Sequence, residues 1–240
     1  MANSKRTIDI RALTTPAEMR AAVALQKSIW GFEDFELLPV RLFVVATKIG
    51  GQVFGAYDSA ELVAFCLAIP GIKAGLHPYL HSHMLGVAPE YRNLGLGRML
   101  KTRQREDALL RDITLMEWTF DPLELKNAYF NIERLGAIVR RFTRNQYGAT
   151  TSHLHAGLPT DRCTAEWHLA SARVTGFLDG APPPSPPTEV RIEVPTDLKL
   201  ARASQSRISD EFDELLGTGL AVTGFERSER FGTYLLTKWE

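Results

Sequence analysis

The sequence predicts a protein of the α/β (α+β) class, in which strand-forming and helix-forming segments share one chain. Three observations support this prediction. Segments that alternate apolar and polar residues are interleaved with segments whose apolar residues recur every three or four positions. Turn-forming residues, mainly Gly, Pro and Asp, separate these segments. A turn with two glycines, at 92–98, stands between a strand-like run and a helix-like run.

The first half of the chain predicts the order β-α-α-β-β-β-α. The opening strand covers 7–15. The helix after it has a capping threonine at Thr15 and a proline at Pro16, and it stops at Gly31. The remaining segments are a helix at 40–49, a hairpin of two strands with its turn near 58–60, a strand at 79–87 and a helix from about 96 to 111.

The second half continues with β-α-β-β. Its segments are a strand at 114–122, a short helix at 125–136 that ends at a C-cap glycine, and strands at 137–148 and 164–171. After Ser171 the composition changes, and the run GAPPPSPPTE cannot continue a sheet or a helix. We therefore predict a main domain at 1–171 and a proline-rich linker at 172–187.

The last segment, 188–240, predicts a strand, a helix and two closing strands, a βαββ extension. Apolar residues follow helical spacing in its helix: Ile208, Phe212, Leu215 and Leu216. So short a segment buries too little apolar surface for an independent core. We expect the extension to pack on the main domain or on a second subunit.

The composition excludes several classes of protein. Lys plus Arg equals Asp plus Glu, at 28 each, which argues against a strongly basic nucleic-acid binder. No apolar run is long enough to span a membrane, and no apolar region follows the first six residues, so we expect a cytoplasmic protein without a signal peptide. Cys66 and Cys163 match no metal spacing, and His153 and His155 lack a third ligand, so we expect no metal.

The run LGVAPEYRNLGLGRML contains the chemistry that the sequence points to. Glycines at Gly95 and Gly97 let a ligand approach the backbone closely at a helix start. Backbone N–H groups of such a loop converge on an anion, and the helix dipole adds about 0.3–1 kcal/mol there. Arg92 and Arg98 supply charge-assisted hydrogen bonds to phosphate oxygens. The sequence therefore predicts a site for a phosphate compound.

Two familiar phosphate motifs fit this run poorly. A dinucleotide fingerprint needs a third glycine where Leu100 stands and a turn directly after the strand, whereas residues 88–92 intervene here. A Walker loop needs Gly-Lys-Ser/Thr, which is absent from the run.

The run resembles the acyl-CoA-binding motif of the GNAT N-acyltransferase superfamily. The core of that motif, Arg/Gln-x-x-Gly-x-Gly/Ala, begins five residues after the valine of a Leu-x-Val strand end, and Val87 and Arg92 have this spacing. The segments EWTFDPLELKNAYFNIERLGAIVRRF, QYG and GLPTDR resemble a poorly characterised branch of the superfamily with a C-terminal extension. The resemblance implies a mixed, mostly antiparallel twisted sheet, in which the strand 79–87 carries a bulge and splays from the strand 114–120.

The resemblance also implies acetyl-CoA or another acyl-CoA as cosubstrate. Unpaired N–H groups at Leu85, Gly86 and Val87 would bind the pantetheine and polarise the thioester carbonyl. The pyrophosphate would lie beside Arg92, on N–H groups of the residues that follow it: Asn93, Leu94, Gly95, Leu96, Gly97 and Arg98.

Catalytic positions follow from the same resemblance. Many relatives place a carboxylate base four residues before the valine, and here that residue is His83, which by period two shares a face with His81, Leu85 and Val87. A histidine is a plausible base at neutral pH, and an ordinary strand histidine is the alternative.

The usual general acid is missing, because Ile132 occupies the position of the tyrosine. Tyr147 and Tyr129 are substitutes by residue type only. Asn127, which shares a helix face with Asn131 at i, i+4, would hold a pantetheine amide, and an ordinary surface amide is the alternative.

Two further groups have competing interpretations. Trp30, Phe32 and Phe35 lie where relatives place their acceptor-binding loop, with core packing as the alternative. Glu117 and Asp121 lie near a strand end, where either could meet the substrate amine or cap a turn, and we favour the turn for Asp121.

The predicted function is acyl-CoA-dependent N-acyl transfer to the amine of a small molecule, with an amino acid among the candidates. The amine would attack the thioester directly in a ternary complex. The alternative is a non-catalytic GNAT-fold protein that binds acyl-CoA. The sequence leaves the acyl chain, the acceptor and a homodimer open.

Overall fold

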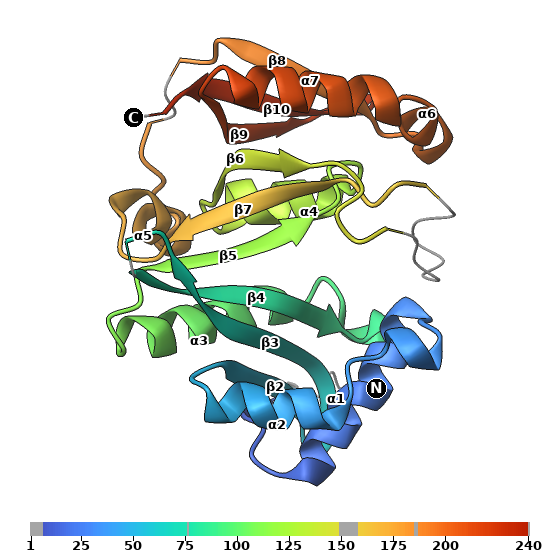
Figure 1. Ribbon diagram of the computed structural model, residues 1–240, viewed down its shortest axis with the longest axis vertical. Helices are drawn as coiled ribbons and strands as arrows, with labels where there is room; N and C mark the ends of the chain where they lie inside the picture. Colours follow the sequence, from blue (N-terminus) through green and yellow to red (C-terminus); the bar gives the residue numbers. More distant parts are fainter. Residues whose placement is uncertain (1–6, 76, 149–157, 185–186, 240) are drawn as a thin grey trace, which may run out of the picture. The chain divides into compact units, whose positions relative to one another are not determined.

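The computed structural model describes residues 7–75, 77–148, 158–184 and 187–239, which fall into two compact units (Figure 1). Within these residues, the first unit is 7–114 and the second comprises 115–148 and everything from 158 onward. The element order up to 171 is the predicted one. The N-terminal residues 1–6 and the pair His153 and His155 lie outside the described residues.

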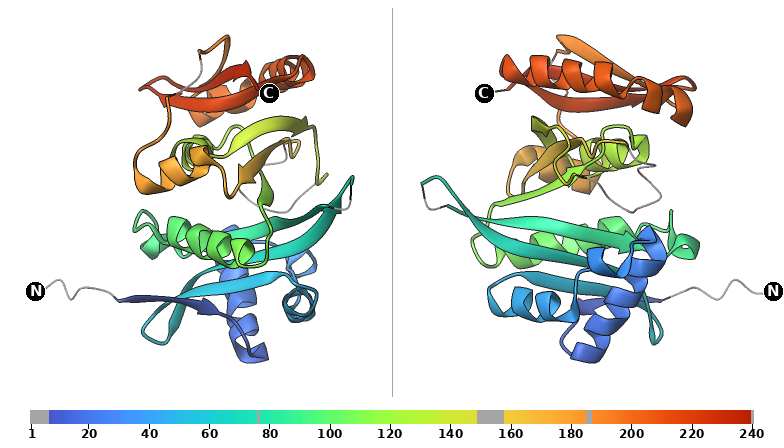
Figure 2. Two further views of the ribbon diagram at one scale, coloured as in Figure 1. Left: turned by 90° about the vertical axis from the view of Figure 1, so that its left-hand side faces the viewer. Right: turned by 45° about the vertical axis from the view of Figure 1, so that its right-hand side comes forward.

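The first unit contains a four-stranded antiparallel sheet in the order β1-β2-β3-β4. Its elements are β1 (Ile8–Ala12), α1 (Pro16–Trp30), the short η1 (Asp34–Glu36), α2 (Val40–Lys48), β2 (Gln52–Asp58), β3 (Glu61–Lys73), β4 (His77–Val87), the short η2 (Pro89–Tyr91) and α3 (Leu96–Leu109). Helices α1 and α2 cover one face of this sheet and α3 covers the other (Figure 2).

Local chemistry explains how α1 begins and ends. The side chain of Thr15 accepts a hydrogen bond from the backbone N–H of Glu18, whose carboxylate accepts one from the backbone N–H of Thr15. Pro16 occupies the first turn, and Gly31 closes the helix in the left-handed region at φ 64°. The predicted start and end of this helix are confirmed.

Strand β4 contains a bulge, as the resemblance implies. Met84 lies opposite Leu67, and His81 lies opposite Ile69, so Ala68 alone faces both Ser82 and His83. The extra residue makes the side-chain alternation of β4 change sides at this point.

The bulge corrects one prediction about His83. Leu85 and Val87 pack in the cluster on the α3 face, whereas Met84 packs in the cluster on the α1–α2 face. His81 lies opposite Ile69, which by period two shares the α1–α2 face with Leu67, and the ring of His83 is 5.9 Å from that of His81. His83 therefore shares a face with His81, as predicted, but not with Leu85 and Val87.

The second unit contains an antiparallel sheet in the order β5-β7-β6-β9-β10-β8. Its elements are β5 (Leu115–Phe120), α4 (Leu125–Tyr129), the π-helical turn η3 (Phe130–Arg134), β6 (Ile138–Thr143), β7 (Arg162–His168), α5 (Ala172–Asp179), β8 (Val190–Pro195), α6 (Leu198–Ala203), α7 (Gln205–Gly217), β9 (Leu220–Arg227) and β10 (Phe231–Lys238).

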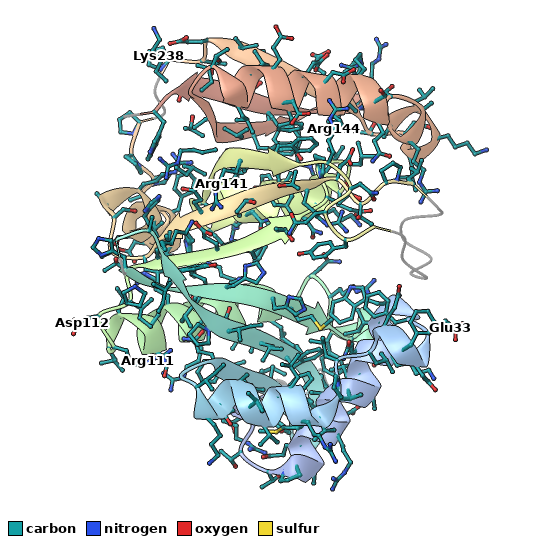
Figure 3. All side chains as sticks on the ribbon, in the orientation of Figure 1. Glu33, Arg111, Asp112, Arg141, Arg144 and Lys238 are labelled. Carbon is teal, nitrogen blue, oxygen red and sulfur yellow. The ribbon has the colours of Figure 1, made fainter. Side chains whose placement is uncertain are left out.

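The C-terminal elements pack on β6 in this unit. The rings of Phe142 and Phe212 stack 5.3 Å apart, so α7 covers β6. Arg144, at the end of β6, pairs with Asp210 at 2.6 Å and with Asp213 at 2.5 Å (Figure 3). The apolar stripe of α7 is therefore covered by residues of the same chain.

Asp161 is a buried anchor for the same helix. Its carboxylate accepts hydrogen bonds from the hydroxyl of Ser209 at 2.6 Å and from the amide of Gln205 at 3.0 Å. The backbone N–H of Asn145 donates a third bond at 2.8 Å. These bonds join α7 to the segments that flank β6 and β7.

Two segments differ from the prediction. The linker is shorter than 172–187, because Ala172–Asp179 forms helix α5, which Ser171 caps through the N–H of Val174 and Gly180 ends at φ 76°. The helix at 125–136 turns π-helical at Phe130; its C-cap is Leu135, and the predicted closing glycine, Gly136, follows in the left-handed region at φ 74°. A splayed pair of β4 and β5 would join the two units and stays a prediction, as do the domain boundaries.

Candidate functional site

The loop between β4 and α3 has the geometry of an anion-binding turn. Asn93 and Gly95 both adopt left-handed backbone conformations, at φ 64° and φ 84°. Gly95 is the N-cap and has no side chain to cap the helix, and the first helical bond runs from the N–H of Met99 to the carbonyl of Gly95. The N–H groups of the first turn therefore point out of the helix start, where an anion is stabilised.

Space and charge at this loop also suit a phosphate. Residues 92–95 are exposed, and a Cβ atom added to Gly95 would meet no atom within 4 Å. Glycine is required there by the positive φ rather than by crowding from the protein. Arg92 is exposed beside the loop, where its Nε lies 3.4 Å from the carbonyl of Val87, and Arg98 is half-buried in the first turn. A pyrophosphate fits the charge and the donors of these residues.

The end of β4 leads directly into this loop. Leu85 and Val87 are half-buried and pack on the α3 face. Gly86 lies under α1, because a Cβ there would come within 2.7 Å of the Trp30 ring and 2.8 Å of Ile29. The glycine thus lets α1 approach the strand, a role that its sequence position did not indicate.

His83 lies in the bulge four residues before Val87. Its ring is half-buried, and burial lowers the pKa of His83 below the ordinary value of 6.5. The lowered pKa keeps the imidazole neutral, and able to accept a proton, across the neutral range. A neutral imidazole at this position suits a general base.

A buried polar network lies behind the bulge, on the α3 face. The ammonium of Lys101 donates a hydrogen bond to the hydroxyl of Ser82 at 2.8 Å, and that hydroxyl donates to the side-chain oxygen of Gln104 at 3.2 Å. Lys101 is 3 % exposed and Ser82 is 4 % exposed. Burial lowers the pKa of Lys101 to about 7, and burial raises the pKa of the nearby Cys66 thiol to about 12.

Sequence reasoning missed this network, although a signal was present. Lys101 and Gln104 interrupt the apolar stripe that Leu96, Leu100 and Ala108 form on α3. Polar residues at such positions are buried only with partners.

The second unit contains the other candidates. Asn127 is exposed on α4, which leaves its amide accessible, whereas Asn131 is buried and accepts a bond from the indole of Trp118 at 3.1 Å. They do not share one environment, because the change to π-helical spacing at Phe130 breaks the i, i+4 alignment. Ile132 is fully buried, so no proton donor occupies that position.

Tyr147 lies over β5. Its hydroxyl is 2.8 Å from the hydroxyl of Thr119, and the guanidinium of Arg162 lies 5.5 Å from its ring centre. The ring is about half exposed. Tyr147 therefore presents a partly exposed phenol beside β5.

The remaining candidates have mainly structural contacts. Glu117 is buried and bonds Arg141 at 2.5 Å, and Asp121 caps a turn by accepting from the N–H of Leu123 at 2.8 Å. The turn preferred for Asp121 is confirmed. Trp30 packs on the core beside Phe65, with ring centres 6.2 Å apart, whereas Phe35 is exposed.

Neither a metal centre nor a membrane span is found in the part of the chain that the structure describes. No group of three or more metal-ligating side chains occurs among those residues. None of their helices is long and apolar enough to cross a bilayer.

Comparison with known proteins identifies the fold through solved structures alone. No family model and no curated protein sequence matches the chain. The ribosomal-protein-S18-alanine N-acetyltransferase of Escherichia coli is 17% identical, with a TM-score of 0.53 over 69% of this chain and 96% of its own. A GNAT-family acetyltransferase of Streptococcus pneumoniae is 14% identical, with a TM-score of 0.52 over 67% of this chain and 98% of its own.

A third similar structure is yncA of Salmonella typhimurium, solved with its cofactor acetyl-CoA. It is 16% identical, with a TM-score of 0.55 over 70% of this chain and 97% of its own. These likenesses confirm the predicted fold class, α/β with the arrangement of the GNAT acetyltransferases.

Proposed function

We propose that this chain, which has the fold of the GNAT acetyltransferases, is an acyl-CoA-dependent N-acyltransferase acting on the amine of a small molecule. The acyl group would be acetyl or another short chain, and an amino acid is among the acceptors considered. The observation that carries the proposal is the exposed, left-handed loop at Asn93 and Gly95, directly before the start of α3. The acetyl-CoA held by yncA supports the choice of cosubstrate.

The first unit would bind the cosubstrate, which supplies an acyl group activated as a thioester. Amides of residues 93–98, with Arg92 and Arg98, would hold the pyrophosphate. The backbone of Leu85, Gly86 and Val87 would hold the pantetheine and polarise the carbonyl.

His83 would accept the proton that the acceptor amine loses as its nitrogen bonds to the carbonyl carbon and the carbon–sulfur bond breaks. Tyr147 is the candidate that would return a proton to the leaving sulfur. Asn127 would bind an amide of the pantetheine arm. Both assignments rest on residue type and accessibility, and each is tested by the turnover of an alanine variant.

The direct test is turnover by the purified full chain. Acetyl-CoA is mixed with a panel of amino acids and small amines, free thiol is followed, and acylated products are identified by mass spectrometry. Thiol release that depends on one amine, with an equal amount of N-acyl product, is the expected result. Thiol release that no amine accelerates would overturn the assignment as an N-acyltransferase.

A second candidate function is acyl-CoA binding without turnover. The observation that favours it is the burial of Ile132, where many relatives place their acid tyrosine. Acyl-CoA that co-purifies with the chain, without transfer to any amine, would support this candidate. A cytoplasmic location and a homodimer stay predictions from the sequence.

A further inference from the structure

We propose that Lys101 and Ser82 fasten the β4 bulge to helix α3 and thereby position His83 for acyl transfer. The inference rests on the proposed function and assigns positioning roles to two residues on one side of the bulge. Every residue in the argument belongs to the first unit.

The first step is the location of Ser82. Ser82 and His83 are the two residues that face Ala68 alone, so they form the bulge itself. The hydroxyl of Ser82 points to the α3 face, where it contacts Lys101 and Gln104, while the ring of His83 lies beside that of His81. Restraining Ser82 therefore restrains the backbone that carries His83 on the opposite face.

The second step is the helix from which the restraint comes. Lys101 lies about one helical turn beyond Gly97, in the helix whose start forms the candidate phosphate loop. The same helix is held on β2, because the amide of Gln52 donates to the carbonyl of Gln104 and to the carboxylate of Asp107, each at 2.8 Å. One rigid element thus connects the phosphate loop with the bulge.

The third step is the cost of burying an amine. Lys101 is almost fully enclosed, and removing an ammonium from water is unfavourable, which lowers the pKa of this group. A methionine would fill this space without that cost. A polar group kept at such a position is better explained by a geometric role, here at the bulge, than by stability alone.

The experiment compares Ser82→Ala and Lys101→Met with Ser82→Thr, which keeps the hydroxyl, and with Arg103→Met as the control. Arg103 is a half-exposed residue of the same helix that lies over the Phe54 ring, away from the bulge. Acetyl-CoA affinity is measured by calorimetry and folding by thermal unfolding. We expect affinities within about threefold of the parent chain, because the phosphate loop is untouched.

The decisive readout is the side-chain NMR titration of His83, assigned among the six histidines with a His83→Ala variant. A loosened bulge admits solvent, so the His83 midpoint should rise toward 6.5 in Ser82→Ala and Lys101→Met. Ser82→Ala leaves the amine of Lys101 in place, so a rise in that variant does not come from removing the amine. Turnover should fall about 10- to 100-fold in the variants whose His83 midpoint rises, and Ser82→Thr should keep both values close to those of the parent chain.

Several outcomes would overturn the inference. An unchanged His83 midpoint in Ser82→Ala would show that Ser82 and Lys101 only fill the core. A rise of the His83 midpoint in Arg103→Met as large as that in Lys101→Met would show the same. A loss of acetyl-CoA affinity that matches the loss of rate shows that the pair shapes the phosphate loop. If Lys101→Met does not fold, Ser82→Ala and Ser82→Thr decide alone. If the parent chain acylates no amine, the proposed function fails. The NMR titration of His83 still tests whether Lys101 and Ser82 hold the β4 bulge on α3.

Discussion

Glu117 on β5 and Glu166 on β7 lie directly opposite each other in an antiparallel ladder, and both residues are only 3 % exposed. Like charges in this position repel. Strand β6 resolves the conflict, because Arg140 binds Glu166 and Arg141 bonds both Glu166 and Glu117. A bulge at Arg140 brings the two consecutive arginines to the same face (Figure 3 labels Arg141).

This relationship predicts acid sensitivity of the second unit. Burial acts to raise the pKa of Glu166, but interactions with His168, Arg140 and Arg141 outweigh it and lower the pKa to about 2. A lowered folded-state pKa stabilises the protein above the unfolded value near 4.5, and this stability is lost as the pH falls from there toward 2. Glu166→Gln should remove much of that acid dependence and cost about 1–3 kcal/mol at pH 7.

The matched control is Glu226→Gln, in an exposed pair with Arg191 at 2.6 Å. An exposed pair contributes about 0–1 kcal/mol, so this variant should unfold nearly as the parent chain does. Chemical denaturation at several pH values measures both. If both variants change the free energy of unfolding equally, the buried network contributes no more to stability than an exposed ion pair does.

If residues 92–98 bind the phosphates of acetyl-CoA, Gly97→Val should weaken that binding. The backbone of Gly97 has no positive φ, so a valine there leaves the helix intact while its branched side chain crowds the bound anion. Acetyl-CoA affinity should fall at least about tenfold, or about 1.4 kcal/mol, by calorimetry. Gly217→Val, at the open end of α7, is the control for valine in a helix. Unchanged affinity in a folded Gly97→Val protein would refute the phosphate-loop assignment.

We expect the His83→Ala variant to lose turnover while it still binds acetyl-CoA. If it takes the proton of the amine, His83→Ala should lower turnover by at least about 10²-fold. Because burial lowers the pKa of His83, the acid limb of the pH–rate profile should lie below 6.5. His77→Ala, an exposed histidine at the start of β4, is the control. Near-normal turnover of His83→Ala would assign His83 a structural role.

Because Lys101 is buried, we expect the free energy of unfolding to rise with pH just above neutrality. Its folded pKa is about 7, against 10.5 for an ordinary lysine, so the unfolded chain binds more protons between these values. Stability should therefore increase from pH 7 toward about pH 8.5, by at most about 1.4 kcal/mol per pH unit. Burial raises the pKa of the Cys66 thiol from 9.0 to about 12, so ionisation of this cysteine in the unfolded chain opposes the rise above about pH 9. Lys101→Met should lack the slope, and Arg103→Met should keep it.

Substitution of Asp161 measures how much its buried hydrogen bonds to α7 contribute to the free energy of unfolding. Asp161→Ala leaves the buried hydroxyl of Ser209 without its acceptor and removes one of the two acceptors of the Gln205 amide, which should cost about 1–3 kcal/mol. Asp210→Ala, which breaks an exposed pair with Arg144, should cost about 1 kcal/mol or less.

A chain ending near Ala181 should expose the face of Phe142 and aggregate. A truncated chain as soluble and stable as the full one would show that the extension is an independent appendage.

The sequence by itself determined the elements and the motif. Thr15, Pro16 and Gly31 mark the ends of α1 because capping and left-handed closure depend on a few neighbouring residues. The turn at Gly95 and the α3 start are likewise local, so the spacing from Val87 to Arg92 predicted both the loop and the fold.

Only the tertiary structure decided which faces the side chains occupy. Period two placed His83 with Leu85 and Val87, but a bulge depends on how the partner strand β3 pairs, and one extra residue changes the face. The burial of Lys101 depends in the same way on where α3 docks on the sheet. Alternation within a segment is local information, whereas register and burial arise from contacts between segments that are distant in sequence.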